Sequence, residues 1–503
     1  MNAPKTTHPT RRPLSPALTQ TPSTKLSLLY SREGRREGLR STPSPSGANN
    51  LSIASPCDRR RERVGVRGLR FLPRTVCSPS FSLSSIQKRG QAKAWTPNKT
   101  ITHLILALLT FLAATTASAT PNLTLTRTKF YLIHSDLDDA LIYDLGTRLD
   151  SMYAEYSRRL SDFDLRADRK PLDVYLFRTK ADYTAFTAGK HQNTGGVFLP
   201  SRNQLVSYLD GQRDTLRRTL QHEAFHQFAH KALGPNVPVW LNEGLAQLFE
   251  EGIWTGEGFL MQQVPPRRLR QLQSDIKNNK LLPLKTILEL SPDQWAANLS
   301  KDAGAGTIQY NQAWAMIHYM AYGDSGKNGL KLVEMLRALT RGKEGLPAFE
   351  DAYGANLTAF RNGFERYASS LQPTEESTLI DRHEVLTDLC AQLADRGKTF
   401  RDVAEFRKLV DSYRYKLRYT RGQVSWTADP GSYFRDGNGR AYPQETLFFD
   451  ARPGGPLPDL VFKQAGLRLS LRGRFFTSQD GKKLEYEVLV EPPAGESAAA
   501  AGR

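Results

Sequence analysis

Residues 221–227 read Gln-His-Glu-Ala-Phe-His-Gln, and residues 240–246 read Trp-Leu-Asn-Glu-Gly-Leu-Ala. On a helix, His222 and His226 project from one face about one turn apart, so both imidazoles can reach a single metal ion. Glu223 is rotated away from this pair, which places its carboxylate to act on a water rather than to bind the metal. The first stretch therefore predicts a metal-binding helix.

The flanking residues predict that this helix is packed rather than exposed. Asp214 or Thr215 can cap its start, and Gly234-Pro235 supply a stop after Leu233. Apolar residues recur at helical spacing and can bury the other side of the helix. They are Leu216, Leu220, Phe225, Phe228, Ala229 and Ala232.

Glu243 is the candidate third ligand. A catalytic zinc usually takes three protein ligands and leaves a fourth position for water. Glu243 opens a new helix sixteen intervening residues after His226, and Gly244 has no side chain to hold that helix away from the histidine helix. The alternative is a pair of surface histidines followed by an unrelated acidic helix start.

Together the two stretches resemble the gluzincin zinc metallopeptidases, most closely the bacterial DUF1570 family of the peptidase MA-like group, over about residues 129–371. The resemblance implies that His222, His226 and Glu243 bind Zn²⁺ and that Glu223 is the general base. The gap between His226 and Glu243 is a little shorter than in gluzincin aminopeptidases. An amine-binding Gly-rich motif like theirs is not evident before His222, which favours an endopeptidase.

The resemblance also implies an α+β fold. A zincin-like domain combines a small mixed sheet, the active-site helix and a helical subdomain, and a helical and then β-rich region follows it. The pattern predicts strands at 130–133 and 174–177, helices at 138–162 and 181–188, and a hairpin over 195–209. In gluzincins the strand bordering the cleft binds substrate by strand addition, and this hairpin is the candidate; the alternative is an ordinary edge hairpin.

A further helix is expected from Tyr310, and it resembles the family segment that packs across the zinc site. Tyr310 is the candidate hydrogen-bond donor to the developing oxyanion, and the alternative is a tyrosine that only packs. Gln247 and Glu250 are candidates to orient the ligand imidazoles.

Several other polar residues have a structural interpretation. His318 is expected in the core or on a helix surface, and His230 beside a helix C-terminus. Cys390, alone after the leader, is expected to be a buried thiol. A run of arginines either touches an acidic substrate or forms a solvated face, and its members are Arg267, Arg268 and Arg270.

The formal charge of +18 over 503 residues suggests an anionic partner, but its distribution argues against one. Residues 1–119 hold 19 Lys plus Arg against 4 Asp plus Glu, and the remaining residues hold 50 against 47. No nucleic-acid partner is therefore expected. Residues 1–100 are rich in Ser, Pro, Thr and Arg and are expected to be a disordered leader. The open alternative is a start assigned too far upstream.

Residues 101–119 contain a short apolar core followed by Ala117-Ser118-Ala119. This pattern predicts a signal peptide cut near Ala119, and the alternative is a single-pass membrane anchor with a basic cytoplasmic tail. Residues 120–372 are expected to form the catalytic domain. Residues 373–503 are expected to form an accessory region of helices, then strands, then a frayed tail.

These expectations combine into one functional hypothesis. The chain is expected to be an exported zinc-dependent metallopeptidase, periplasmic, secreted or at the cell envelope, that hydrolyses peptide or protein substrates. Two alternatives remain open. One is an inactive gluzincin-like binding module at the cell envelope, and the other is a basic nucleic-acid or membrane protein that depends on the leader's charge alone.

Overall fold

The computed structural model describes residues 121–163, 170–209, 212–301, 303–413, 416–421, 424–467, 469–478 and 481–491. The expected leader at 1–100 and the expected signal or anchor at 101–119 lie outside these residues. The fold is α+β, as the sequence predicts. Within the described part, no helix has both the length and the apolar character needed to cross a bilayer.

A mixed five-stranded sheet forms the N-terminal part. Its strands run in the order β1-β2-β3-β5-β4, with β2, β3 and β5 parallel and both edge strands antiparallel to their neighbours. Asn203 has a φ of 52° in the tight turn that joins β4 to β5. The strands are β1 Thr124–Arg127, β2 Tyr131–Ser135, β3 Leu172–Phe177, β4 Gly196–Leu199 and β5 Gln204–Tyr208.

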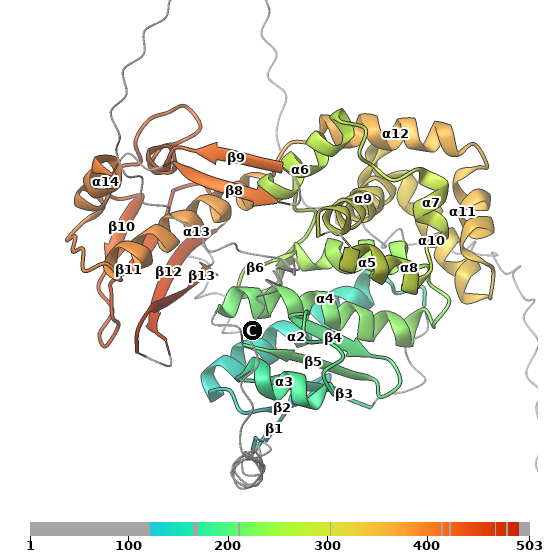
Figure 1. Cartoon of the computed structure of the whole chain (residues 1–503), viewed down its shortest axis with the longest axis horizontal. Coiled ribbons are helices and arrows are strands. Elements are labelled where there is room, and N and C mark those ends of the chain that lie inside the picture. The colour runs from blue at the N-terminus through green and yellow to red at the C-terminus, as the bar shows by residue number, and fades with distance from the viewer. Residues whose placement is uncertain are drawn as a thin grey trace, which may run out of the picture.

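Helices α2 (Asp139–Arg159) and α4 (Arg213–Ala232) pack together and bury apolar side chains against this sheet. Helix α3 (Lys180–Phe186) contributes Tyr183 to a separate cluster with residues of β3 and β5. Figure 1 shows α4 lying between the strands β4 and β5 and the helix α5 (Val239–Glu250). The histidine helix therefore lies at the centre of this part of the molecule.

The start of α4 differs from the sequence prediction. Its N-cap residue, Gln212, makes no side-chain capping bond. The Asp214 carboxylate instead accepts hydrogen bonds from Arg217, at 2.8 Å, and from the main-chain nitrogen of Val488, at 2.7 Å. The prediction of a capping side chain at Asp214 or Thr215 is wrong, because Asp214 is used in a contact with the C-terminal region. The predicted stop is correct, since α4 ends before Gly234, which has a φ of 78°.

A helical part follows α4, and the long helix α9 runs through it (Figure 1). Helix α9 packs against α5, α6, α8, α10 and α12. The elements after α5 are β6 Ile253–Trp254, β7 Phe259–Leu260, α6 Pro266–Lys277, α7 Leu284–Glu289, α8 Pro292–Lys301, α9 Ala303–Tyr322, η1 Asp324–Gly326, α10 Asn328–Thr340, α11 Gly345–Tyr353 and α12 Leu357–Ser370.

Gly244 allows helix α5 to pack closely against another helix, but that helix is not α4, the one that the sequence predicts. A Cβ atom at this position would lie 2.5 Å from Ile317 Cγ1 and 2.7 Å from the carbonyl oxygen of Ala313. Both residues belong to α9, so the missing side chain lets α5 approach α9 rather than the histidine helix α4. The sequence identified the need for a glycine correctly and assigned it to the wrong helix.

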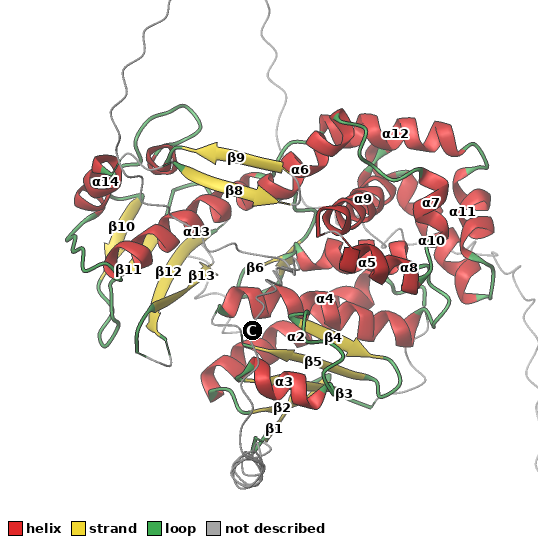
Figure 2. Cartoon of the chain, viewed as in Figure 1, coloured by secondary structure: helices red, strands yellow, loops and turns green. Residues whose placement is uncertain are grey.

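The C-terminal region has a hydrophobic core of its own, which includes Cys390, a fully buried thiol as expected. Figure 2 shows α13 lying across an antiparallel sheet of order β10-β11-β12-β13. The elements are α13 Glu375–Ala394, α14 Val403–Ser412, β8 Leu417–Arg421, β9 Val424–Ala428, η2 Pro430–Phe434, β10 Leu447–Asp450, β11 Asp459–Phe462, β12 Ser470–Thr477 and β13 Leu484–Glu491.

Ion pairs tie this region to α4 and α6. Arg217 lies 2.8 Å from Glu487, and Arg218 lies 2.8 Å from Glu384. Two arginines of the basic run in α6 make similar contacts: Arg267 pairs with Asp381 at 2.5 Å, and Arg270 lies over the Trp426 ring at 4.9 Å. Arg267 is thus half-buried and paired within the protein, whereas Arg270 stays exposed, as expected of a solvated face.

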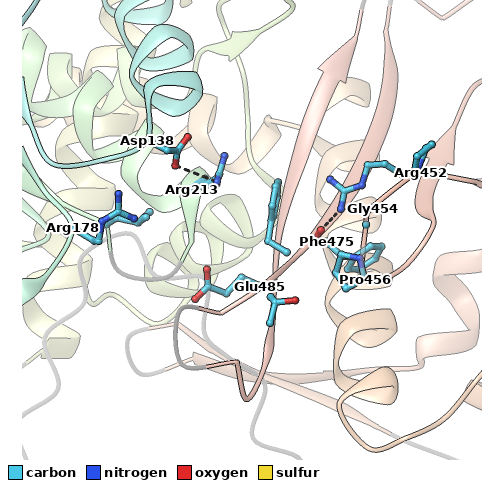
Figure 3. A pocket seen from close by; sticks show the side chains of 13 residues that line it. Asp138, Arg178, Arg213, Arg452, Gly454, Pro456, Phe475 and Glu485 are labelled. Carbon is cyan, nitrogen blue, oxygen red and sulfur yellow. Dashed lines mark hydrogen bonds and ion pairs between the residues drawn. The ribbon is translucent and has the colours of Figure 1, made fainter.

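A pocket of about 490 Å³ opens where the N-terminal part meets the C-terminal sheet (Figure 3). Arg213 and Arg452 both lie over the Phe476 ring, at 4.3 and 5.2 Å from its centroid. Arg213 also pairs with Asp138 at 3.6 Å, and Arg452 donates to the carbonyl of Phe475. Because these arginines are engaged with the pocket walls, the pocket is a structural junction between the two regions.

Candidate metal centre

Helices α4 and α5 bring the three predicted ligands together. One donor atom from each of His222, His226 and Glu243 lies within 4.8 Å of the other two. Glu243 Oε2 is 3.2 Å from Nε2 of His222 and 3.7 Å from Nε2 of His226. The i, i+4 spacing places both imidazoles on one face of α4, and α5 adds the carboxylate of Glu243.

The spacing of the donor atoms resembles that of a zinc site. Zinc bonds of about 2.0–2.1 Å in a tetrahedron place the ligand atoms roughly 3.4 Å apart. The separations of 3.2 and 3.7 Å lie on either side of this value. Two imidazoles and a carboxylate are also the ligand types of catalytic zinc sites with an open fourth position. The ligand types and the two separations from Glu243 therefore fit a zinc ion.

Glu250 supports the first histidine. Its Oε2 lies 3.0 Å from Nδ1 of His222, so the ring nitrogen that faces away from Glu243 has a carboxylate partner. A ligand histidine usually has such a partner, which fixes its tautomer and orientation. Gln247, the other candidate for this role, instead donates to the carbonyls of Glu243 and Tyr310. Nδ1 of His226 is buried and has no hydrogen-bond partner among the described residues.

Burial and charge have opposite effects on the pKa values of the residues at this centre. Burial alone would lower the pKa of His222, but its hydrogen bonds to Glu243 and Glu250 hold that pKa well above the usual range. Burial likewise would raise the pKa of Glu243, and the two histidines hold it well below its usual range. For Glu250, the bond to His222 and the charge of Arg268 overcome burial and lower the pKa to about 2. The carboxylates therefore remain available as ligand and as partner.

Glu223 lies outside the set of converging donors, as its helical position predicts. Its Oε2 accepts a hydrogen bond of 2.9 Å from the main-chain nitrogen of Phe198 in the edge strand β4. Gly196, on the same strand, makes this approach possible, because a Cβ there would lie 2.6 Å from Thr219 and 3.3 Å from Cγ of Glu223. The strand and the helix thus meet at the predicted general base.

Tyr310 lies on α9 beside the centre. Burial raises the pKa of its hydroxyl well above the usual range, and the carboxylates of Glu243 and Glu223 raise it further. The Tyr310 hydroxyl therefore stays protonated and can donate a hydrogen bond at any ordinary pH. Its ring packs edge-on against Trp295, with 5.2 Å between centroids.

The other candidate histidines stand apart from the metal ligands. His318 is buried, and its Nδ1 lies 2.7 Å from the Tyr367 hydroxyl. His230, one turn beyond His226, lies beside the Phe198 ring at 5.5 Å between centroids. Both positions agree with the structural roles expected for them.

Three contributors to the site were not predicted from the sequence. No sequence pattern marks the Phe198 amide as part of the site, because every residue except proline carries this donor. His191 precedes β4 and lies within electrostatic range of Glu223, and burial lowers its pKa. Arg268 was grouped with a solvated charge run, yet its i, i+4 spacing from Leu272 places it on the buried stripe of α6.

Comparison with known families gives one match. Residues 217–343 match the model of the DUF1570 family, which is described as a protein of unknown function. The matched segment contains the three candidate ligands, Glu223 and Tyr310. This agrees with the family that the sequence resembles. No curated protein and no solved structure matches the chain.

Proposed function

We propose that this chain is an exported zinc-dependent metallopeptidase. The proposal rests on one observation. Two imidazoles and a carboxylate converge from α4 and α5, and a second carboxylate, that of Glu223, directly follows His222 on α4 but lies outside the converging set. A purely structural metal site would use a closed ligand set and would not require this additional carboxylate. The same arrangement argues against an inactive binding module.

Zinc, when bound by His222, His226 and Glu243, supplies a Lewis acid and favours deprotonation of water. Glu223 accepts the proton of the attacking water and then passes it to the leaving amine. The Phe198 amide orients Glu223, because it donates to one carboxylate oxygen and leaves the other to act as base. Tyr310 donates a hydrogen bond to the oxyanion as negative charge develops.

The substrate is proposed to be a peptide or protein segment in extended form. Strand β4 is an edge strand, and an edge can accept a further strand through main-chain hydrogen bonds. Because Phe198 on β4 already contacts Glu223, a peptide lying along this edge would pass the general base. Export is proposed because residues 101–119 have the pattern of a signal peptide; these residues lie outside the part that the structure describes.

Zinc analysis of the purified wild-type protein and three variants tests this function. Wild-type protein is expected to hold about one zinc per chain, which His226→Ala loses and Glu223→Gln keeps. His230→Ala, on the same helix but outside the ligand set, is the matched control and should retain zinc.

Peptide-library cleavage on the same samples separates the roles. Glu223→Gln should lower kcat by about 10²–10⁴-fold, because the general base is removed. Tyr310→Phe should lower kcat with little change in KM, since its hydrogen bond strengthens in the transition state. Folded wild-type protein without zinc would refute the proposal, and zinc binding without cleavage would favour the binding module.

A further inference from the structure

Arg268 is a buried arginine behind the metal centre. Its residue is only 2% exposed, and its Nη2 lies 2.8 Å from Glu251 Oε1. The guanidinium also lies over the Trp314 ring of α9, 5.3 Å from the centroid. A buried charge is costly unless it is paired and hydrogen-bonded, so these contacts hold the guanidinium in one place.

The same guanidinium determines how the Gln247 side chain is oriented. Arg268 Nη1 donates to Oε1 of Gln247. Because arginine has donors only, the amide must turn its oxygen toward Arg268 and its nitrogen the other way. That nitrogen, Nε2, donates to the carbonyl of Tyr310 at 3.1 Å and to the carbonyl of Glu243 at 3.3 Å. A reversed amide would lose all three contacts.

The neighbouring polar cavity, of about 130 Å³, does not suggest a ligand for this charge. Its lining arginines are balanced by carboxylates, and they pair directly, as in Arg218 with Glu384 and Arg268 with Glu251. A binding site for an anion would leave positive charge without such partners. The contacts of Arg268 are therefore with groups of the protein itself.

We propose that Arg268 is a positioning residue of the candidate active site. By orienting Gln247, it fixes the separation between the third metal ligand, Glu243 on α5, and the oxyanion donor, Tyr310 on α9. Two groups on different helices need such a link, since a displacement of about 1 Å can cost 10²-fold in rate. This inference rests on the proposed function, which gives Glu243 and Tyr310 their roles.

Three variants test this role. Arg268→Gln removes the charge and the fork that holds Gln247. Gln247→Glu keeps a partner for Arg268 at similar volume but replaces the donor to the Tyr310 carbonyl with an acceptor. Arg267→Gln is the matched control, because this adjacent arginine pairs with Asp381 on α13.

Arg268→Gln should weaken zinc affinity by about 10–100-fold in a chelator competition, as the loss of residues that support ligands typically does. Both Arg268→Gln and Gln247→Glu should lower kcat with little change in KM. The Gln247 amide contacts the main-chain carbonyl of Tyr310 at 3.1 Å. In a metal-free crystal structure of each variant, this carbonyl should have moved away from the side chain at position 247. Arg267→Gln should match wild type in all three measurements.

A double-mutant cycle separates positioning from a general structural role. In a Tyr310→Phe background, Arg268→Gln should lower kcat less than in wild type, because no hydroxyl remains to be misplaced. An equal loss in both backgrounds would overturn the inference, as would a folded Arg268→Gln protein with wild-type zinc affinity and kcat. If Arg268→Gln does not fold, an unchanged kcat in Gln247→Glu overturns it.

The two proposals fail in different ways. Wild-type protein that holds no zinc and cleaves no peptide would refute the metallopeptidase function. Wild-type protein that does both, with an unaffected Arg268→Gln variant, would refute only the positioning role.

Discussion

Replacing Gly244 with alanine should damage the protein and its metal site together. The new Cβ would lie 2.5 Å from Ile317 Cγ1 and 2.7 Å from the Ala313 carbonyl oxygen, whereas carbon contacts are favourable at about 3.5–4.0 Å. Helices α5 and α9 would have to separate by roughly 1 Å to reach that range. A main-chain carbonyl cannot rotate away, so the helices themselves must move.

Two opposing effects set the size of the change. Alanine is favoured over glycine inside a helix by about 1 kcal/mol. Overpacking of a core typically costs about 1–3 kcal/mol. We expect the overpacking to dominate and to lower the free energy of unfolding by about 1–2 kcal/mol. Glu243 precedes Gly244 and moves with it, and ligand positions must hold to about 0.2 Å, so zinc affinity should fall on the order of tenfold.

Urea unfolding and chelator competition measure the two effects. Gly258→Ala is the control, because a Cβ there would meet no atom within 4 Å, and it should change stability by less than about 0.5 kcal/mol. A Gly244→Ala protein that is as stable as wild type and binds zinc equally well would refute the argument from close packing of α5 on α9.

Two further predictions concern pH and metal. Burial lowers the pKa of His383 to about 4, so its contribution to stability is present above its unfolded pKa of about 6.5 and is lost as pH falls through 4. The loss should reach about 3 kcal/mol, and a His383→Asn variant should show a flatter stability profile between these pH values. Removing zinc should lower the free energy of unfolding by about 4 kcal/mol when free zinc had been 1,000 times its Kd. Thermal scans with and without a chelator measure this difference, which should vanish in His226→Ala.

Much of the N-terminal fold could be predicted because its signals are local. The helix predicted at 138–162 is α2, and the predicted strands and hairpin correspond to β2, β3, β4 and β5. Each of these predictions depends on periodicity or turn chemistry within a few residues. The cap predicted at Asp214 failed because its carboxylate is held by Arg217 and by Val488, a residue far away in the sequence.

The support of the site could be predicted only in part. Glu250 and Gln247 were both reasonable partners for a ligand histidine, since they lie on the helix that carries Glu243. Which of them faces His222 depends on how α5 is rotated against α4, and the structure assigns this contact to Glu250. Arg268 could not be separated from Arg267 and Arg270 by composition, because all three belong to one basic run.

By itself, the sequence predicted the candidate metal donors and the position of Glu223, because both follow from spacing along one helix and a following helix start. Only the tertiary structure decided that Gly244 serves the contact with α9 and that the Phe198 amide holds Glu223. These facts depend on the distances between elements distant in the chain. Such distances arise from packing of the whole core, which no local pattern specifies.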